Sequence, residues 1–327
     1  MKAQQRIFFD FLRFCIGTTS EIPASMKDAD WKVMYGIAKK QALIGVLFHG
    51  IQQLPKELAP DGDLLMTWMG MAQRIKQLNI RLFMDSAKVC KNFKDAGFRN
   101  CILKGQGNAL RYPNLYIRTP GDIDIYLNSG RKRIMEYVDK VWPNQVMRYH
   151  HVDFPVMKTP IEVHFTPSYM FFPIHNSRMQ KWFKKVMDLQ CSNVVTLPDG
   201  YGEITVPTMS FNVIYILSHL YRHVFTEGIG LRQLIDYYFV LRNTDCNITN
   251  KVVLQRELKH LGLWKFAKAV MYVLHEALGL PEAKMIAPID VNEGRFLLSE
   301  IMQGGNFGQY DTRLGSKEYE GKLHRYL

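Results

Sequence analysis

Cysteine is scarce in this chain, and no two cysteines are close enough in sequence to form a CxxC pair. The 327 residues include five, an odd number: Cys15, Cys90, Cys101, Cys191 and Cys246. This usage argues against a thiolate zinc site and fits a reducing compartment. We therefore expect a cytoplasmic protein.

Long apolar runs are missing as well. Nowhere do eighteen or more apolar residues follow one another without interruption, so the sequence predicts no transmembrane segment. The N-terminus has a basic start and an apolar stretch, but Asp10 and Arg13 interrupt it and no small-residue cleavage site follows. An amphipathic helix is expected there rather than a signal peptide. Internal repeats and low-complexity segments are also absent.

Positive charge is in excess, with a formal net charge of +12. Such an excess attracts phosphates, whether of a nucleotide, a nucleic acid or an anionic lipid, but solubility alone accounts for it equally well. The apolar content of 47% and the charged content of 22% are those of an ordinary globular protein. The length allows two or three packed units.

Helical patterns dominate both ends of the chain. Residues 1–97 predict an N-terminal helical region that closes with a long helix over residues 63–96, for which Gly97 is a suitable C-cap. Residues 174–327 predict a mostly helical C-terminal region with a β-hairpin near 194–206. Its main helices are expected over residues 177–189, 210–224, 231–242, 251–261 and 263–278, the last ending at Gly279. The final residues, SKEYEGKLHRYL, resemble the start of a helix that continues in a longer parent protein.

The middle of the chain has a different pattern. From about residue 98 to 165, short apolar or alternating runs are separated by helix-like stretches in the order β-α-β-α-β-β. Strands are expected at Cys101–Leu103, around Ile123–Leu127, within 146–157 and at 161–165, and Ser129 is a candidate cap for a basic helix over 130–141. We therefore predict an α+β fold, in which a small mixed-sheet core at 98–173 is flanked by the two helical regions.

Acidic residues alternate with apolar ones in two of these strands. Side chains at positions i and i+2 of a strand share a face, so Asp122 and Asp124 project together, as do Glu162 and His164. If the two strands are neighbours, three carboxylates converge, and such repulsion is costly without a cation between them. Hard oxygen ligands of this kind suit Mg²⁺ or Mn²⁺, which also bridge to substrate phosphates.

A Lys104-Gly105 turn follows the first strand. Glycine lets the backbone approach a phosphate closely, and amides at the start of a following helix complement its charge. Lys104 or Arg118 would neutralise phosphate oxygens. Alternatively, Lys104 is a strand-end lysine without a functional partner, and Arg118 forms an ion pair with Asp122 that positions the loop.

Together these stretches resemble a known superfamily. The segment ILKGQGNALRYPNLYIRTPGDIDIYL, with IEVH about forty residues later, is similar to the polymerase-β-type nucleotidyltransferases, and closest to a group of bacterial uncharacterised nucleotidyltransferases. The resemblance covers about 98–165 and extends more weakly to HLYRHVFTEGIGLRQLIDYYF. It implies that Asp122 and Asp124 hold the metal ions, that Glu162 is the third carboxylate, and that the turn at Gly105 holds the triphosphate.

Two positions depart from the superfamily pattern. Gln106 stands where serine is usual, so a hydroxyl contact to phosphate is missing, and Glu162 stands where aspartate is common. Both changes fit a diverged enzyme, and both also fit a nucleotide-binding relative that has lost catalysis.

Several histidines are candidate supporting groups. For His164 there are three interpretations: a residue that orients a metal ligand, a base, or a structural histidine. His150 and His151 are adjacent and should point to opposite faces of a strand, so one of them is placed to approach the site. His219 and His223 lie four residues apart on an expected helix. That spacing is compatible with zinc, but the glutamate of a metalloprotease motif is absent, and nucleotide or substrate contact is the better interpretation.

Basic residues outside the core motif have two interpretations each. Arg232 either reaches a phosphate or forms a helix-capping ion pair. The clusters Arg131-Lys132-Arg133 and Lys181, Lys184, Lys185 are typical of solvated helix faces, although Trp182 and Phe183 within the second cluster are residue types that also stack on nucleic-acid bases.

The sequence thus predicts a nucleotidyltransferase that moves an NMP group from ATP or another NTP to a hydroxyl-type acceptor with two Mg²⁺ or Mn²⁺ ions. A small-molecule acceptor is favoured over RNA or protein. The main alternative is a non-catalytic nucleotide- or phosphosugar-binding sensor on the same fold, and a transferase that modifies tRNA or a protein is a third possibility.

Overall fold

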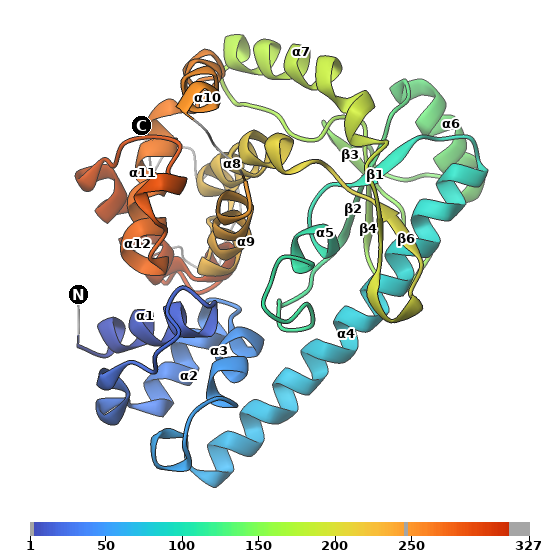
Figure 1. Cartoon of the computed structure of the whole chain (residues 1–327). Helices are drawn as coiled ribbons and strands as arrows, with labels where there is room; N and C mark the ends of the chain where they lie inside the picture. Colours follow the sequence, from blue (N-terminus) through green and yellow to red (C-terminus); the bar gives the residue numbers. More distant parts are fainter. Residues whose placement is uncertain (1–2, 245–247, 314–327) are drawn as a thin grey trace. The chain divides into compact units, whose positions relative to one another are not determined.

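A computed structural model describes residues 3–244 and 248–313 of the chain. It is 60% helical with a small mixed sheet (Figure 1), so the predicted α+β class is confirmed. Among the described helices, none has both the length and the apolar composition that a membrane span requires. The expected helix in the last twelve residues, and Cys246, lie outside the described residues.

The elements, labelled as in Figure 1, have the following bounds. The α-helices are α1 (Ala3–Cys15), α2 (Trp31–Lys40), α3 (Ile44–Ile51), α4 (Gly62–Asp95), α5 (Gln106–Ala109), α6 (Arg131–Val141), α7 (Pro173–Gln190), α8 (Met209–Thr226), α9 (Leu231–Arg242), α10 (Ile248–His260), α11 (Trp264–Leu278) and α12 (Val291–Gly304). The strands are β1 (Asn100–Ile102), β2 (Ile123–Leu127), β3 (His151–Asp153), β4 (Ile161–His164), β5 (Val194–Thr196) and β6 (Glu203–Thr205).

The described residues form two compact units. The first comprises 3–77, 111–119 and the described part of 220–313, and the second comprises 78–110 and 120–219. The three-region division expected from the sequence stays a prediction about domain boundaries.

The second unit is built on a four-stranded sheet in the order β1-β2-β4-β3. β2 and β4 are parallel, with Asp124 opposite Glu162, whereas β1 and β3 are antiparallel edge strands. The predicted order β-α-β-α-β-β over this segment is therefore confirmed. The hairpin is found where it was expected, as β5 and β6 with Pro198–Gly200 at the tip.

One face of this sheet is apolar, because Ile123, Ile125 and Val163 alternate with the polar residues of β2 and β4. Helices α4 and α6 cover it, on the right-hand side of the sheet in Figure 1. Phe93 of α4 has its ring centroid 5.6 Å from those of Tyr137 on α6 and Phe154 beside β3. Because this aromatic cluster forms the core on one face of the sheet, the opposite face can present polar groups.

The first unit is helical and has its own apolar core. Trp68 is fully buried, with its ring centroid 5.9 Å from that of Trp31, and its indole N–H donates to the carbonyl of Ile44. Helix α11 ends as predicted at Gly279, whose φ of +69° is the left-handed conformation that glycine adopts readily. Helix α12, which the sequence patterns did not single out, packs against α11.

Two local predictions are wrong. Ser129 does not cap α6, because the N-cap is Gly130, which provides no side-chain hydrogen bond. The strand expected within 146–157 is reduced to His151–Asp153, and residue 147 adds only an isolated bridge to residue 152. Pro155 and the turn near it prevent a longer ladder, since proline has no N–H to donate.

Replacing Phe93 by alanine should remove the centre of the aromatic cluster and cost about 3–5 kcal/mol of the free energy of unfolding. Urea denaturation measures the loss, and exposed Lys91 on the same helix provides the control substitution, Lys91→Ala, with a cost below about 0.5 kcal/mol. Similar values for the two variants would contradict the assignment of Phe93 to the core.

Candidate metal centre

Asp124 occupies the middle of the polar face of the sheet. Its side chain is only 1% exposed, and both of its carboxylate oxygens have a positively charged or hydrogen-bonding neighbour. Oδ1 lies 2.9 Å from His164 Nε2, and Oδ2 lies 3.0 Å from Lys104 Nζ. The parallel pairing of β2 with β4 produces the first contact, and the turn after β1 supplies the lysine.

These partners decide the ionisation of the buried groups. Burial alone would raise the pKa of Asp124, but Lys104 and His164 together hold that pKa well below its usual range. Burial would lower the pKa of Lys104, and the carboxylates of Asp124, Asp122 and Glu162 raise it instead. Asp124 is therefore an anion and Lys104 a cation at neutral pH.

Asp122 and Glu162 complete the group of acids. The pKa of Asp122 is raised, first by the nearby charge of Asp124 and then by burial. Asp122 is therefore the acid whose ionisation is opposed by its negatively charged neighbour. Glu162 lies opposite Asp124, with its Oε2 3.3 Å from His164 Nε2. Burial would raise its pKa, but the hydrogen bond from His164 lowers it. The predicted convergence of the two acidic strands is thus present.

The Lys104-Gly105 turn lies against these acids. Gly105 has φ +61° and ψ −111°, a backbone conformation that other residues rarely adopt. A Cβ at Gly105 would lie 3.6 Å from the carbonyl oxygen of Asp122, so the turn passes close to that residue. Lys104 Nζ is also 3.4 Å from Nε2 of His219 on α8. The structure therefore brings His219, one of the predicted supporting histidines, next to the lysine.

Gln106 is not directed toward the carboxylates. Its side chain is buried, with the residue 1% exposed, and its amide nitrogen is 3.4 Å from the backbone and side-chain oxygens of Asn79 on α4. The helix that it opens, α5, has only four residues, so its dipole is small. The contribution expected from a helix N-terminus at this turn is accordingly slight.

The adjacent histidines His150 and His151 both reach the polar face, although strand alternation predicted that only one would. β3 begins at His151, so His150 lies before the strand and escapes its alternation. His150 Nε2 is 3.2 Å from His151 Nδ1, which is 3.5 Å from Glu162 Oε2. Burial lowers the pKa of His151 despite the neighbouring Glu162.

Arg118 is held by a partner that the sequence did not indicate. In the first unit its guanidinium makes a bidentate ion pair with Asp236 of α9, at 2.9 and 2.8 Å. Tyr112 donates a further hydrogen bond to Asp236 at 2.7 Å. Arg232 donates to the carbonyl of Thr119 at 3.0 Å and lies over the ring of Phe307. These contacts pack Arg118 and Arg232 within the first unit, and phosphate binding by either arginine stays a prediction.

Among the described residues, potential metal ligands form three overlapping groups of three, and neither His219 nor His223 belongs to any of them. His223 Nδ1 instead contacts Glu227 Oε2 at 3.1 Å.

The residues present suit a divalent cation. Ligand atoms of Asp124, Glu162 and His164 lie within 4.8 Å of one another. Each carboxylate oxygen has two lone pairs, so Asp124 can bind an ion while it keeps its contacts to Lys104 and His164. Asp122 lies outside this set but is close enough to share its electrostatic field.

A cavity of about 250 Å³ lies beyond the carboxyl ends of β2 and β4 in the second unit. The two strands and the residues that follow them contribute Tyr126, Asn128 and Phe165, and α7 contributes Gln180, Phe183 and Lys184. Ligands of α/β sheets commonly bind at this end of parallel strands. The lining therefore combines aromatic rings with polar side chains.

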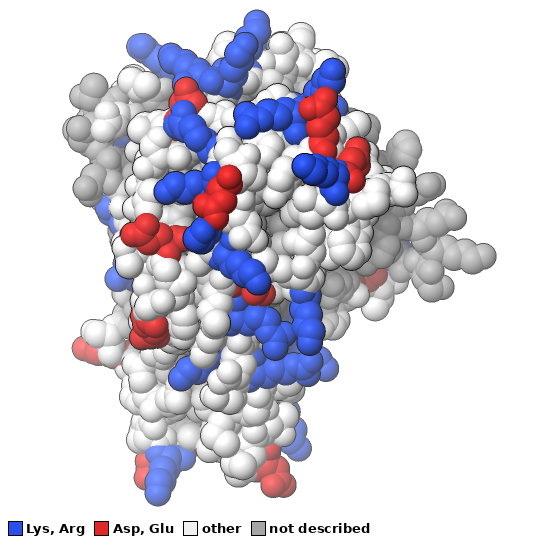
Figure 2. All heavy atoms as spheres, turned by 90° about the vertical axis from the view of Figure 1, so that its right-hand side faces the viewer, with Lys and Arg blue, Asp and Glu red and all other residues white. Residues whose placement is uncertain are grey.

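The basic clusters lie on exposed helix faces, as expected, although Arg131 and Arg133 also lie over the rings of Phe165 and Phe98. Arg131, Lys132 and Arg133 are exposed on α6, as are Lys181, Lys184 and Lys185 on α7. Figure 2 shows a face on which Lys and Arg side chains predominate over acidic ones. Within the second cluster, however, Trp182 stacks on Phe211 with ring centroids 5.3 Å apart, and Phe183 is buried. The two aromatic side chains are thus engaged in packing rather than displayed for bases.

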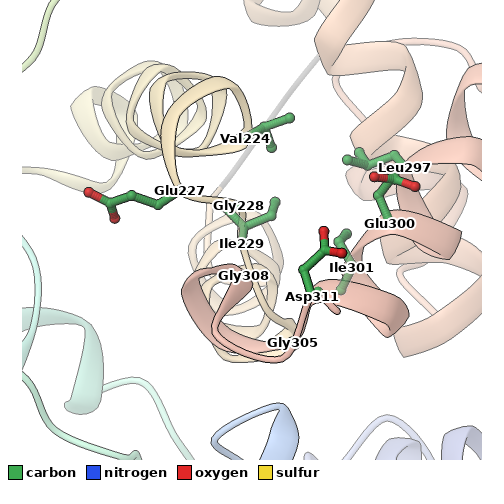
Figure 3. A pocket seen from close by; sticks show the side chains of 11 residues that line it. Val224, Glu227, Gly228, Ile229, Leu297, Glu300, Ile301, Gly305, Gly308 and Asp311 are labelled. Atoms are coloured by element: carbon green, nitrogen blue, oxygen red, sulfur yellow. The ribbon is translucent and has the colours of Figure 1, made fainter. Parts of the chain in front are cut away.

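Another pocket lies in the first unit, between the α8–α9 junction and α12 (Figure 3). Three acidic residues line it: Glu227, Glu300 and Asp311. All three are already paired, because Arg313 lies 2.7 Å from Glu300 and 3.0 Å from Asp311, and His223 lies 3.1 Å from Glu227. This pocket is narrow and lacks the clustered ligands of the polar face.

A comparison with protein-family models matches residues 27–279, more than half of the chain, to the model described as uncharacterised nucleotidyltransferase. The chain belongs to this family. Membership in the nucleotidyltransferase family supports a general role in nucleotidyl transfer and implies an NTP substrate. Nucleotidyltransferases usually use divalent metals, for which the polar face has possible ligands. No curated protein and no solved structure matches the chain significantly.

The His164–Asp124 contact predicts a pH-dependent stability. Burial lowers the pKa of His164, but Asp124 and Glu162 raise it overall, so the folded protein favours the protonated form. This contribution is complete below about pH 6.5 and is lost as the pH rises through the raised pKa. In metal-free buffer, His164→Gln should cost about 1.5–3 kcal/mol near pH 6 and clearly less near pH 9. Equal losses at both pH values, measured by urea unfolding, would contradict this ionisation.

The buried pairing of Arg118 predicts a structural phenotype. Arg118→Ala leaves the Asp236 carboxylate buried without its main partner, which typically costs about 3–5 kcal/mol. Exposed Arg111 on the same segment gives the control, Arg111→Ala, with little effect. Thermal unfolding tests both. An Arg118→Ala protein of normal stability that no longer binds NTP would instead assign this arginine to phosphate.

Proposed function

We propose that this nucleotidyltransferase moves an NMP group from an NTP to a hydroxyl-type acceptor and releases pyrophosphate. Asp122, Asp124 and Glu162 would hold Mg²⁺ or Mn²⁺. The observation that carries the proposal is the parallel pairing of β2 and β4, which places Asp124 directly opposite Glu162 on a polar sheet face. Membership in the family gives this arrangement its chemical context.

In the proposed reaction, the acceptor oxygen attacks the α-phosphorus, its proton passes to solvent, and the bond to the pyrophosphate oxygen breaks. A bound divalent ion supplies charge neutralisation for the phosphates and lowers the pKa of the attacking hydroxyl. The protein itself contributes positioning and preorganised charge, which need no covalent intermediate.

Lys104 is the residue proposed to meet the phosphates. Its ammonium is partly exposed, with 18% of the side chain accessible, whereas its partner Asp124 is buried. The ammonium therefore has donors left to bind a phosphate oxygen while Asp124 holds it in place. Gly105 would let the backbone of the turn approach the same phosphates.

The cavity beyond β2 and β4 is proposed to receive the acceptor. Its lining includes Tyr126, which lies two positions after Asp124 on the same strand. Its volume, about 250 Å³, suits part of a small molecule better than a folded RNA or protein. A small-molecule acceptor and a cytoplasmic location remain our proposals.

A second candidate, a non-catalytic nucleotide sensor, is favoured by two contacts. Lys104 and His164 already neutralise Asp124, so this carboxylate stays charged without a metal ion. In addition, Gln106, at the position where the superfamily has serine, is buried against Asn79 and has no hydroxyl to offer a phosphate.

Transfer of an α-labelled NMP group separates the two candidates. Purified protein is incubated with Mg²⁺ or Mn²⁺, each α-labelled NTP and a cell-extract acceptor pool. We expect labelled product, and we expect Asp122→Asn and Asp124→Asn each to reduce its rate at least about a hundredfold. Asp139→Asn, which removes an exposed carboxylate from α6, is the matched control and should retain the rate.

Tight binding of metal–NTP without label transfer in any pool would overturn the enzyme and support the sensor. Absence of NTP binding would overturn both candidates. If label is transferred, its release by nuclease would identify an RNA acceptor and contradict the small-molecule assignment.

A further inference from the structure

A row of nitrogen and oxygen atoms that can ligate a metal runs along the polar face, starting from the carboxylate that pairs with Lys104. It begins at Asp124 Oδ1 and continues through His164 Nε2 at 2.9 Å, Glu162 Oε2 at 3.3 Å and His151 Nδ1 at 3.5 Å. It ends at His150 Nε2, 3.2 Å from the nitrogen of His151. The donors come from three neighbouring elements, β2, β4 and the start of β3.

These separations are those of ligands around one ion. Nitrogen and oxygen ligands at about 2.0–2.2 Å from a metal lie about 2.9–3.5 Å from one another in octahedral and tetrahedral shells. The three imidazoles offer ligand atoms that all lie within 4.8 Å of one another. A single cation at their centre requires only small shifts of the side chains.

The donor types select a different class of ion from the one proposed for nucleotidyl transfer. Mg²⁺ prefers an all-oxygen shell, whereas imidazole nitrogen suits Zn²⁺, Co²⁺ and the related first-row transition ions. His150, His151 and His164 are each no more than 6% exposed. A carboxylate that is only partly buried, Glu162, lies between two of them and gives the set a path to solvent.

The surroundings also fit a metal site. Ligating imidazoles are commonly oriented by a carboxylate, and Asp153 Oδ1 lies 3.9 Å from Nε2 of His151, the ring nitrogen not used in the donor row. Asp153 belongs to β3, in register with Glu162. Nδ1 of His151 thus faces the proposed ion, whereas Nε2 has a carboxylate nearby that lies beyond hydrogen-bond distance.

We propose that His150, His151 and His164, with Glu162, bind one divalent transition-metal ion of the Zn²⁺ or Co²⁺ class, which replaces the proton that His164 Nε2 holds against Asp124 in the metal-free protein. This site shares Glu162 with the oxygen-lined position around Asp122 and Asp124, but its other ligands are imidazoles, and it does not rest on nucleotidyl transfer. The ion links β4 to His150 and to His151 at the start of β3, and it holds Glu162 in position.

Co²⁺ titration of chelator-treated protein tests the site, with visible absorption reporting the ligands and equilibrium dialysis the stoichiometry. Wild-type protein should bind one equivalent at least about a hundredfold more tightly than Mg²⁺. His150→Gln and His151→Gln should each weaken Co²⁺ binding at least about tenfold. Asp122→Asn, which leaves the imidazoles intact, and His260→Gln, which removes an exposed histidine of α10, should not.

A second measurement avoids substitutions in the buried cluster. Histidine-selective ¹⁵N NMR of wild-type protein should show three of the ten histidines shifting together with the first equivalent of Zn²⁺. Wild-type protein that binds no Co²⁺ or Zn²⁺, or binds it unchanged in the His150 and His151 variants, would overturn the proposal. A protein that binds Co²⁺ but neither binds nor transfers NTP would overturn only the proposed function.

Discussion

The placement of Asp124 between Lys104 and His164 is the interaction on which the rest of the polar face depends. An isolated carboxylate at 1% exposure would cost several kcal/mol and would take up a proton instead. With a cation on each oxygen it stays ionised and holds both partners in position. Asp124 thereby fixes the position of the Lys104 ammonium, which comes from the turn after β1, and of the His164 ring, which lies beside Glu162.

The sheet makes that placement possible because its apolar side chains lie on one face and its polar side chains on the other. Phe93, Tyr137 and Phe154 cover the apolar face, so the core does not need the other side of the strands. Parallel pairing of β2 with β4 then puts their polar residues in register, Asp124 opposite Glu162 and residue 126 opposite His164. One alternation of polar and apolar residues therefore determines both the core and the site.

Alternation is also why much of the site could be predicted from the sequence. A period of two is visible in DIDIYL and IEVH, and it is sufficient to place Asp122 with Asp124, and Glu162 with His164, on common faces. The same rule failed at His150 and His151, because the strand begins between them and only contacts across the sheet show that both reach the polar face. No local pattern marks where a short strand starts.

Long-range partners were beyond sequence patterns for a related physical reason. Arg118 and Asp236 are 118 positions apart, and nothing in either segment specifies that a bidentate pair will form. The orientation of Gln106 likewise depends on α4, because its amide nitrogen donates to the side-chain oxygen of Asn79 on that helix. In both cases the side chain is buried against an element far away in the sequence, which no local pattern indicates.

On the polar face, Lys104 and His164 neutralise Asp124, but the repulsion between the acids is only partly relieved. Asp122 carries that residual repulsion, since the charge of Asp124 raises its pKa. A divalent cation bound there gains from neutralising it, and a triphosphate gains in turn from the cation and from Lys104. Metal and nucleotide should therefore bind cooperatively, each favouring the other to the same extent.

Mn²⁺ binding followed by electron paramagnetic resonance, with and without a non-hydrolysable NTP, tests this cooperativity most directly. We expect the nucleotide to tighten Mn²⁺ binding at least about fivefold, and Mn²⁺ to tighten nucleotide binding by the same factor. Identical Mn²⁺ affinities in the two titrations, or no bound Mn²⁺ in either, would contradict a shared metal and nucleotide site on the polar face.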